Sequence, residues 1–259
     1  MKGFLIRVIS IFSLAAVLLS SMALAEDDSF NKLAGSIYMR DIEKVRELIN
    51  GGVDVNIRQD KSGSSPLMVA CAREGTDDII EFLLSRGAEV NVKGNNGYTP
   101  LMWAAENSLA AVNMLIAGGA RADAVADDGM TTMIKALFGI FTEDVTTEVC
   151  DTLLAHGADI NAALSGGDTG GLTALLFAAN KQMPELVEYL VSKGADVNHQ
   201  SDKGETALMR ACTEGDLETV KILIAAGADP SLKAGDGSTA LSIAEKRDSR
   251  KIAEYLKSL

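Results

Sequence analysis

The chain has 259 residues, of which 24 are Lys or Arg and 36 are Asp or Glu, so its formal net charge is −12. A surface with this excess of negative charge repels nucleic acid and anionic lipid, which argues against both as partners. Four prolines and seven phenylalanines are few for this length, and with the many Ala, Leu and Gly residues they favour repeated helices.

The first residues form a pattern typical of an export signal. Lys2 and Arg7 give a short basic region, Val8 to Leu19 is almost wholly apolar, and Ala23-Leu24-Ala25 matches a small-x-small cleavage site. A membrane helix needs about 20 apolar residues, so a retained transmembrane anchor is the weaker alternative. We expect a signal peptide over 1–25, cleavage after Ala25, and no stable membrane insertion afterwards.

Residues 26–259 are then the mature chain, whose net charge without the two leader cations is −14. This part has no N-x-S/T acceptor for glycosylation, and its cysteine count of three is odd, so at least one thiol is free. We therefore expect an exported protein, in the bacterial periplasm first and secreted as the alternative.

Two short phrases recur in phase along residues 26–259. The first, exemplified by "RGAEVN" and "KGADVN", contains a glycine at positions 52, 87, 119, 157, 194 and 227. The second, exemplified by "TPLM" and "TALM", begins at positions 65, 99, 131, 173, 206 and 239. Two motifs that share one period near 33 residues indicate a repeated structural unit.

Each phrase predicts a local structure. The Ser or Thr of the second phrase is an N-cap, and Pro66 and Pro100 follow it at the first helical position, where proline loses no hydrogen bond. A short helix with buried small residues such as Ala104 and Ala105 follows. A second helix, exemplified by "DIEKVRELI" from Asp41, carries apolar residues at spacings of three and four. The recurring glycine ends that helix, and Asn-Gly or Asp-Gly turns lead to the next cap.

The phrases "TPLMWAAEN" and "TALMRACTEGDLETVKILIAAGAD" resemble the ankyrin repeat family in motif and period. The resemblance implies an all-α solenoid of about seven stacked helix-turn-helix units with β-turn fingers, and a function in binding proteins. The units we expect are an N-terminal cap at 29–59, repeats near 61–93, 95–126, 127–163, 168–200 and 202–234, and a C-terminal cap at 235–259.

The chain departs from the family pattern in two ways. The histidine of the family's helix start is replaced by other residues, so packing must substitute for its hydrogen bonds; the replacements are Met68, Met102, Ile134, Leu176, Met209 and Ser242. The unit that begins at Thr131 is also longer than the others. Thr131 to Gly157 spans 26 positions where Thr206 to Gly227 spans 21, and the connection from Gly157 to Thr173 spans 16 where 12 is usual.

Candidate catalytic residues are few. His199 is surrounded by carboxylates, but its equivalents in other units differ, and His156 suits the C-terminal end of a helix. Cys71 and Cys212 occupy one slot of the repeat as small buried residues, about 40 Å apart in a solenoid and too far for a disulfide. We expect no catalytic, cofactor-binding or metal-binding residues, although the reactivity of Cys150 in the long unit is left open.

The segment "GGDTGG" at 166–171 has two functional readings. A phosphate loop would need a Gly-Lys-Ser/Thr ending, and an aspartic protease would need a second carboxylate. A flexible finger between repeats explains the glycines better.

The family resemblance implies that one face of the short helices, with the residues before the caps, lines a concave surface. Aromatic and charged residues converge on that face in the middle units, where an apolar patch indicates a partner site. We therefore expect a monomer that binds an unidentified protein through Tyr98, Trp103, Glu106, Met130, Phe138, Phe177, Lys181 and Arg210. For the two phenylalanines the alternative is packing within the long unit. The alternative functions are a structural or protective role in the envelope and, less favoured, an enzyme using Cys150 or His156.

Overall fold

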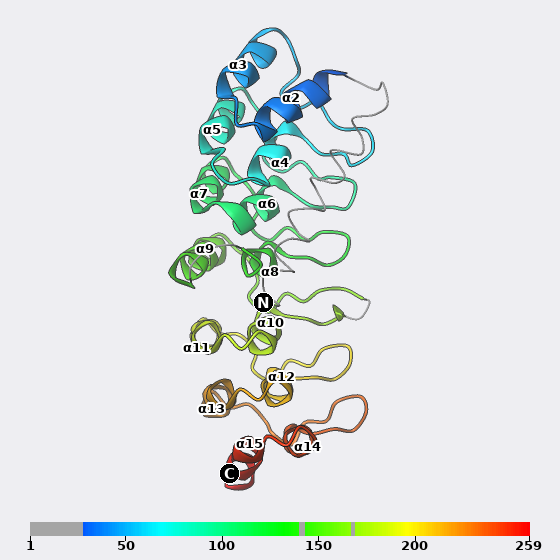
Figure 1. Ribbon diagram of the computed structural model, residues 1–259, viewed down its shortest axis with the longest axis vertical. Helices are drawn as coiled ribbons and strands as arrows, with labels where there is room; N and C mark the ends of the chain where they lie inside the picture. The colour runs from blue at the N-terminus through cyan, green and yellow to red at the C-terminus, as the bar shows by residue number, and fades with distance from the viewer. Residues whose placement is uncertain (1–27, 140–142, 167–168) are drawn as a thin grey trace.

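The computed structural model describes residues 28–139, 143–166 and 169–259, and these form an elongated solenoid (Figure 1). Seven consecutive helix pairs stack along its axis in the described ranges, which contain no strand beyond an isolated bridge between Val125 and Thr131. The predicted all-α solenoid is confirmed. The predicted signal peptide lies outside the described residues. None of the described helices is long and apolar enough to cross a membrane.

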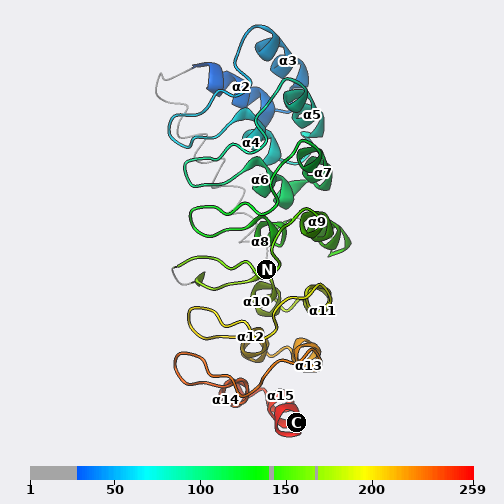
Figure 2. The same cartoon turned by 180° about the vertical axis from the view of Figure 1, so that it is seen from behind.

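The two helices of each pair belong to two parallel rows, which Figures 1 and 2 show from opposite sides. The inner row consists of α2 (Asp28–Tyr38), α4 (Pro66–Cys71), α6 (Pro100–Asn107), α8 (Thr132–Ala136), α10 (Ala174–Asn180), α12 (Ala207–Glu214) and α14 (Ala240–Lys246). The outer row consists of α3 (Ile42–Asn50), α5 (Asp77–Ser85), α7 (Leu109–Ala117), α9 (Glu143–Ala155), α11 (Pro184–Ser192), α13 (Leu217–Ala225) and α15 (Arg250–Lys257). The loops that enter α4 to α14 project from the inner row, away from the outer helices.

The predicted caps begin these inner helices. Each Ser or Thr side chain accepts a hydrogen bond from the backbone amide three residues later, at 3.1–3.4 Å, and Pro66 and Pro100 occupy the first turn. Thr239 and Ser242 form a reciprocal capping box in the last unit. Ser242, which occupies the position of the family's histidine in the last unit, is therefore a capping residue. The other five replacements are buried, so packing does substitute there for the family's hydrogen bonds.

The recurring glycines end the outer helices with positive φ, from 84° at Gly87 to 100° at Gly52. The asparagine four residues later in the phrase binds the next unit through its side chain. Asn91 donates to the carbonyl of Gly119 at 2.9 Å and accepts from the amide of Arg121 at 2.9 Å. Asn56 and Asn198 form the same pair of bonds with their next units. We call this residue the bridging asparagine.

The fingers are also connected to one another. The backbone of each finger hydrogen-bonds the next, as where the amide of Asp127 donates to the carbonyl of Asn96 at 3.1 Å and that of Asp202 to Gly170 at 3.0 Å. A side chain at Gly129 would collide with the backbone of Ser165, so this turn requires glycine, with φ of 79°. The fingers therefore form one continuous ladder beside the inner helices.

The long unit differs from its neighbours in the described residues. Helix α9 has 13 residues, where α3, α5, α7, α11 and α13 have nine each, so the extra length lies partly in the outer helix. In the unit before it, Asp123 stands where the asparagine that would bridge to the long unit is expected, and its carboxylate pairs with Arg121 of its own turn at 2.9 Å. The glycine-rich segment falls partly outside the described residues, at 167–168.

Candidate functional site

The side chains of interest lie where the inner helices meet the fingers of the middle units. The eight predicted binding residues fall into three groups there. Tyr98, Trp103 and Glu106 belong to one cluster, and Met130, Phe138, Phe177 and Lys181 line one pocket. Arg210 lies apart from both, in a second pocket toward the C-terminus.

The first group surrounds an ion pair. Glu106 on α6 accepts a hydrogen bond from Lys135 on α8, and the two side chains are 10% and 9% exposed. The Lys135 ammonium lies 4.7 Å from the centre of the Trp103 ring and 5.8 Å from that of Tyr98, within reach of cation–π attraction. We call these four residues the ion-pair cluster. They fix α6 against α8 through charges that are largely removed from water.

Tyr98 connects this cluster to the next finger. Its hydroxyl donates to the carboxylate of Asp128 at 3.1 Å, and its ring lies 5.3 Å from that of Trp103. Burial, the adjacent Asp128 carboxylate and its hydrogen bond all raise the pKa of Tyr98 above the ordinary value of a phenol, so the hydroxyl stays protonated and keeps donating. Tyr98 and Trp103 are half-buried. They therefore present a rigid aromatic patch instead of two mobile side chains.

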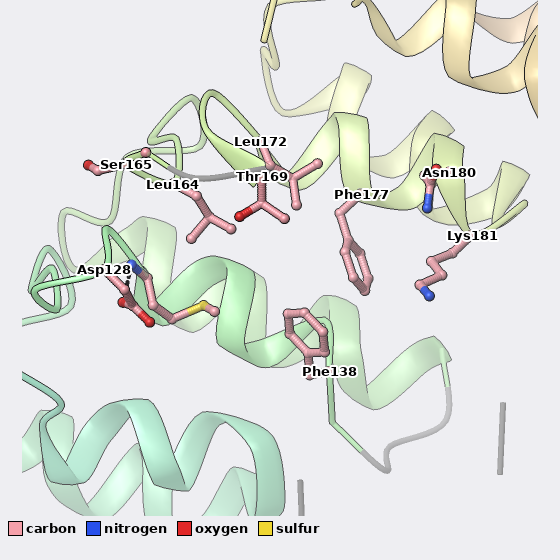
Figure 3. Close-up of a pocket in the computed structure, with 11 residues that line it drawn as sticks. Asp128, Phe138, Leu164, Ser165, Thr169, Leu172, Phe177, Asn180 and Lys181 are labelled. Carbon is pink, nitrogen blue, oxygen red and sulfur yellow. Dashed lines mark hydrogen bonds between the residues drawn. The ribbon is translucent and has the colours of Figure 1, made fainter. Parts of the chain in front are cut away.

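The second group lines a pocket of about 550 Å³ between the long unit and the unit after it (Figure 3). The rings of Phe138 and Phe177 point toward each other across this joint, with centres 4.7 Å apart and planes tilted by 53°. Leu164, Thr169 and Leu172 reach it from the finger. We call it the joint pocket. Its full lining is Asp128, Met130, Phe138, Leu164, Ser165, Gly166, Thr169, Leu172, Phe177, Asn180 and Lys181.

The two phenylalanines pack together and also line the pocket. Phe177 is only 7% exposed, whereas Phe138 is half-buried. Lys181 is exposed at the rim, with its ammonium 5.7 Å from the Phe177 ring centre. The pocket thus has an apolar floor, one cation on one side and Asp128 on the other (Figure 3).

Arg210 lies in a second, more polar pocket of about 820 Å³. Its guanidinium binds Glu205 at 2.6 Å and approaches the side-chain oxygen of Asn180 at 3.5 Å. We call this the basic pocket. Its lining is Lys203, Glu205, Arg210, Thr213, Ala234, Gly235, Asp236, Ser238, Ile243, Lys246 and Arg247.

The candidate catalytic residues are not assembled into a site. Cys150 is buried, and burial with the nearby Asp151 charge raises the pKa of its thiol to about 12. His156 is exposed, directly follows α9, and hydrogen-bonds the Thr152 carbonyl of that helix at 2.8 Å. His199 donates to the carbonyl of Gly171 at 2.9 Å and so connects two fingers. Across the described part of the chain, no three His, Cys, Asp or Glu residues are arranged to hold a metal ion.

Sequence reasoning missed Leu164 and Asp128 of the joint pocket. The amide of Leu164 donates to the carbonyl of Leu172, on the opposite side of the same finger, at 3.0 Å. The amides of Gly94, Ala126 and Ser201 make the equivalent hydrogen bond in their own fingers. Those three residues are small, whereas Leu164 is large and apolar. Aligning the fingers residue by residue would have found this difference, because the slot precedes the inserted glycines.

Comparison with known proteins identifies the repeat. The model of a family described as ankyrin repeats (3 copies) matches residues 33–128, 71–164, 108–201, 133–234 and 175–259, which overlap along the chain. Two solved structures are similar over most of their length. The chain covers 96% of the human ASB11 ankyrin repeat domain and 97% of that of Bcl-3, a member of the IkappaB protein family. These matches cover 86% and 87% of this chain, with TM-scores of 0.71 and 0.69 and 26% identity in both.

Curated relatives match over shorter parts. A putative ankyrin repeat protein of Fowlpox virus (strain NVSL) is 30% identical over 58% of this chain, which spans 44% of that protein. An ankyrin repeat and KH domain-containing protein of Caenorhabditis briggsae is 32% identical over 63% of this chain and 6% of its own length. The chain therefore spans less than half of these relatives.

Proposed function

This chain belongs to the ankyrin repeat family, a fold that generally serves as a protein-interaction module, and on that premise we propose that it binds a protein partner on the inner side of its middle units. The binding surface would consist of the ion-pair cluster and the joint pocket. The chain would act there as a monomeric scaffold without a cofactor.

One observation carries this proposal: the joint pocket, with its apolar floor and charged rim, lies in the same middle units as the Tyr98–Trp103 patch. Interfaces draw most of their affinity from a few aromatic and Arg side chains set in well-packed surroundings. The patch is already ordered by Lys135 and Asp128, so binding costs little further side-chain entropy.

We also propose that binding takes place after export. The support is the N-terminal pattern of a basic region, an apolar run of 12 residues and Ala23-Leu24-Ala25. The compartment proposed is the periplasm, with secretion as the alternative. Fractionation of cells that express the whole chain tests this, because a cytosolic chain that still carries Met1 to Ala25 would contradict export.

Site-specific crosslinking in the native compartment tests the binding surface. A photoreactive residue at Met130 reports on the joint pocket, and one at Lys221, exposed on outer helix α13, is the matched control. We expect one protein to crosslink from Met130 and not from Lys221. Crosslinks only from Lys221, or none from either, would contradict the proposal.

A structural role without a defined hot spot is the alternative, and truncation of side chains separates it from partner binding. Lys181→Ala removes one exposed rim charge and Phe138→Ala removes a half-buried wall of the pocket. Partner binding predicts that both weaken crosslinking from Met130. A structural role that depends only on the chain's negative charge predicts that Phe138→Ala leaves crosslinking from Met130 unchanged, provided the variant remains folded.

A further inference from the structure

Charges are distributed unevenly over this acidic chain. The net charge is −12, yet the basic pocket brings together Lys203, Arg210, Lys246 and Arg247. Two carboxylates, Glu205 and Asp236, face these four cations. The inner side of the last units is therefore locally positive within a negative molecule.

The two carboxylates of the basic pocket already have partners. Glu205 binds the guanidinium of Arg210 at 2.6 Å, and Asp236 accepts from the amide of Ser238 in its own turn at 2.9 Å. Lys246 and Arg247 are exposed at the C-terminal end of α14. The positive charge of these two residues is thus available to a ligand.

Arg210 adds a hydrogen-bond donor that has no acceptor. Its Nε atom is buried, and no protein group accepts from it. A buried donor without an acceptor costs about 1–3 kcal/mol, which a ligand oxygen at this position would recover. Within the basic pocket, Arg210 is the residue that approaches Asn180, which lines the joint pocket.

The two pockets adjoin along the inner helices through one side-chain contact. Asn180 lies at the rim of the joint pocket and approaches Arg210 of the basic pocket at 3.5 Å. Lys181 stands beside Asn180 at the same rim. A chain leaving the joint pocket toward the C-terminus therefore meets Lys181, then Arg210, then Lys246 and Arg247.

From this arrangement we infer that the ligand of the two adjoining pockets is an extended acidic segment of the partner protein, with one large apolar side chain in the joint pocket beside Lys181 and carboxylates on Arg210 and the Lys246–Arg247 pair. The inference rests on the proposed function and adds the chemistry of the partner. Carboxylates are the charge-complementary groups, and electrostatic complementarity fixes register and specificity.

The spacing of the acidic residues follows from the stacking. Packed helices lie about 8–10 Å apart, and an extended chain advances about 3.3 Å per residue, so each unit corresponds to about three residues of ligand. Arg210 and Lys246 come from α12 and α14, the first and second inner helices after α10. Acidic side chains are expected about three and six residues from the apolar anchor.

A phosphate polymer is disfavoured as the ligand. The fingers beside the two pockets carry Asp128, Asp202 and Asp236, and the whole chain is negative. A nucleic acid would meet this long-range repulsion along its length, whereas a short peptide with two or three carboxylates would meet only the local cations.

Fluorescence anisotropy with synthetic peptides tests the inference on the whole chain. The parent peptide of 12 residues carries one Phe with Glu three and six residues after it, and a second peptide has the reverse order. Their controls replace Phe by Ala or both Glu by Gln. Single-stranded DNA of similar length serves as the phosphate probe.

We expect one of the two parent peptides to bind, and its affinity to fall about tenfold in the Lys246→Glu, Arg247→Glu variant, because two favourable charge contacts become repulsive. Thr169→Trp, which fills the joint pocket from an exposed position, should weaken binding similarly. A charge-matched control, Lys221→Glu with Lys251→Glu on outer helices α13 and α15, should bind like the wild-type chain.

The inference is overturned if the Glu-to-Gln peptides bind as well as the parents, if no peptide binds, or if the DNA binds more tightly than the peptides. The proposed function is separable from it. Crosslinking of a partner from Met130 that persists in the Lys246→Glu, Arg247→Glu variant would retain the binding surface and reject the acidic ligand. Loss of all crosslinking from Met130 in the wild-type chain would reject the binding surface itself.

Discussion

Removing one member of the Glu106–Lys135 ion pair should destabilise the solenoid strongly. Lys135→Met keeps the aliphatic stem against Trp103 but leaves the Glu106 carboxylate in a site where its side chain is only 10% exposed. A buried charge that loses its ion-pair partner costs about 3–5 kcal/mol, because its desolvation remains while the attraction of the opposite charge is gone. We expect a loss of this size in the free energy of unfolding.

A double variant distinguishes the cost of an unpaired buried charge from the cost of losing the ion pair itself. Glu106→Leu with Lys135→Met removes both charges and keeps apolar volume between α6 and α8, so it should be more stable than Lys135→Met alone. The matched control is the exposed pair Lys44–Glu47, with side chains 47% and 67% exposed. Lys44→Met should change stability by less than about 1 kcal/mol.

Urea unfolding measures these changes. Trp103 is the only tryptophan in the chain and packs on Lys135, so its fluorescence reports on the cluster while far-UV circular dichroism reports on the whole array. A loss below about 1 kcal/mol for Lys135→Met, or a double variant no more stable than Lys135→Met, would refute the reasoning.

Three further predictions concern individual side chains. Asp123→Asn should stabilise the chain by about 1 kcal/mol, because the amide can form the two hydrogen bonds of a bridging asparagine and only an exposed ion pair is lost. Asn91→Asp should destabilise the chain by a similar amount, and urea unfolding in which both variants match the wild-type chain would contradict this. Gln182→Gly should stabilise the chain by about 0.5–1 kcal/mol, because Gln182 has a left-handed φ of 56°, which strains a residue with a side chain, and the equivalent Gly215 has φ of 75°. Thermal unfolding measures the change, and Gly215→Gln is the control that should destabilise the chain. The three buried thiols should not react with a disulfide reagent at pH 8 until the chain unfolds, since burial raises the pKa of Cys150 and Cys212 from 9.0 to about 12 and raises that of Cys71 too. The folded values lie above the ordinary one, so the thiols leave stability unchanged below pH 9 and lower it as the pH rises toward 12; a thiol that reacts at pH 8 in the folded chain would contradict the burial.

The repeated elements could be predicted because their causes are local. A Ser or Thr cap such as Thr99 needs only its own amide three residues on, and Gly87 adopts positive φ whatever lies around it. The period then fixed which residues stack. The slot shared by Cys71 and Cys212 is buried in both units for this reason.

The site could be predicted less completely because its contacts join residues whose partners are not set by the period alone. Glu106 and Lys135 are 29 residues apart, and a Glu or a Lys in a sequence does not by itself indicate a buried position. Sequence reasoning named Glu106 as a surface residue for a partner, whereas its side chain is largely buried against Lys135. Leu164 lies before the inserted glycines and aligns with Ala126, but its position beside the phenylalanine pair depends on how the long unit packs against the next unit, which the period does not determine.

The irregular unit replaces standard contacts with its own. On its N-terminal side Asp123 occupies the place of a bridging asparagine, and on its C-terminal side Phe138 meets Phe177 beside a pocket. The outer side of that joint is held by Tyr189, whose hydroxyl donates to Asp151 at 2.6 Å. Contacts inside and outside thus hold the joint while space remains between them. A repeat that had merely decayed would lose contacts without replacement, so these replacement contacts support the proposed role of the joint pocket as a binding site.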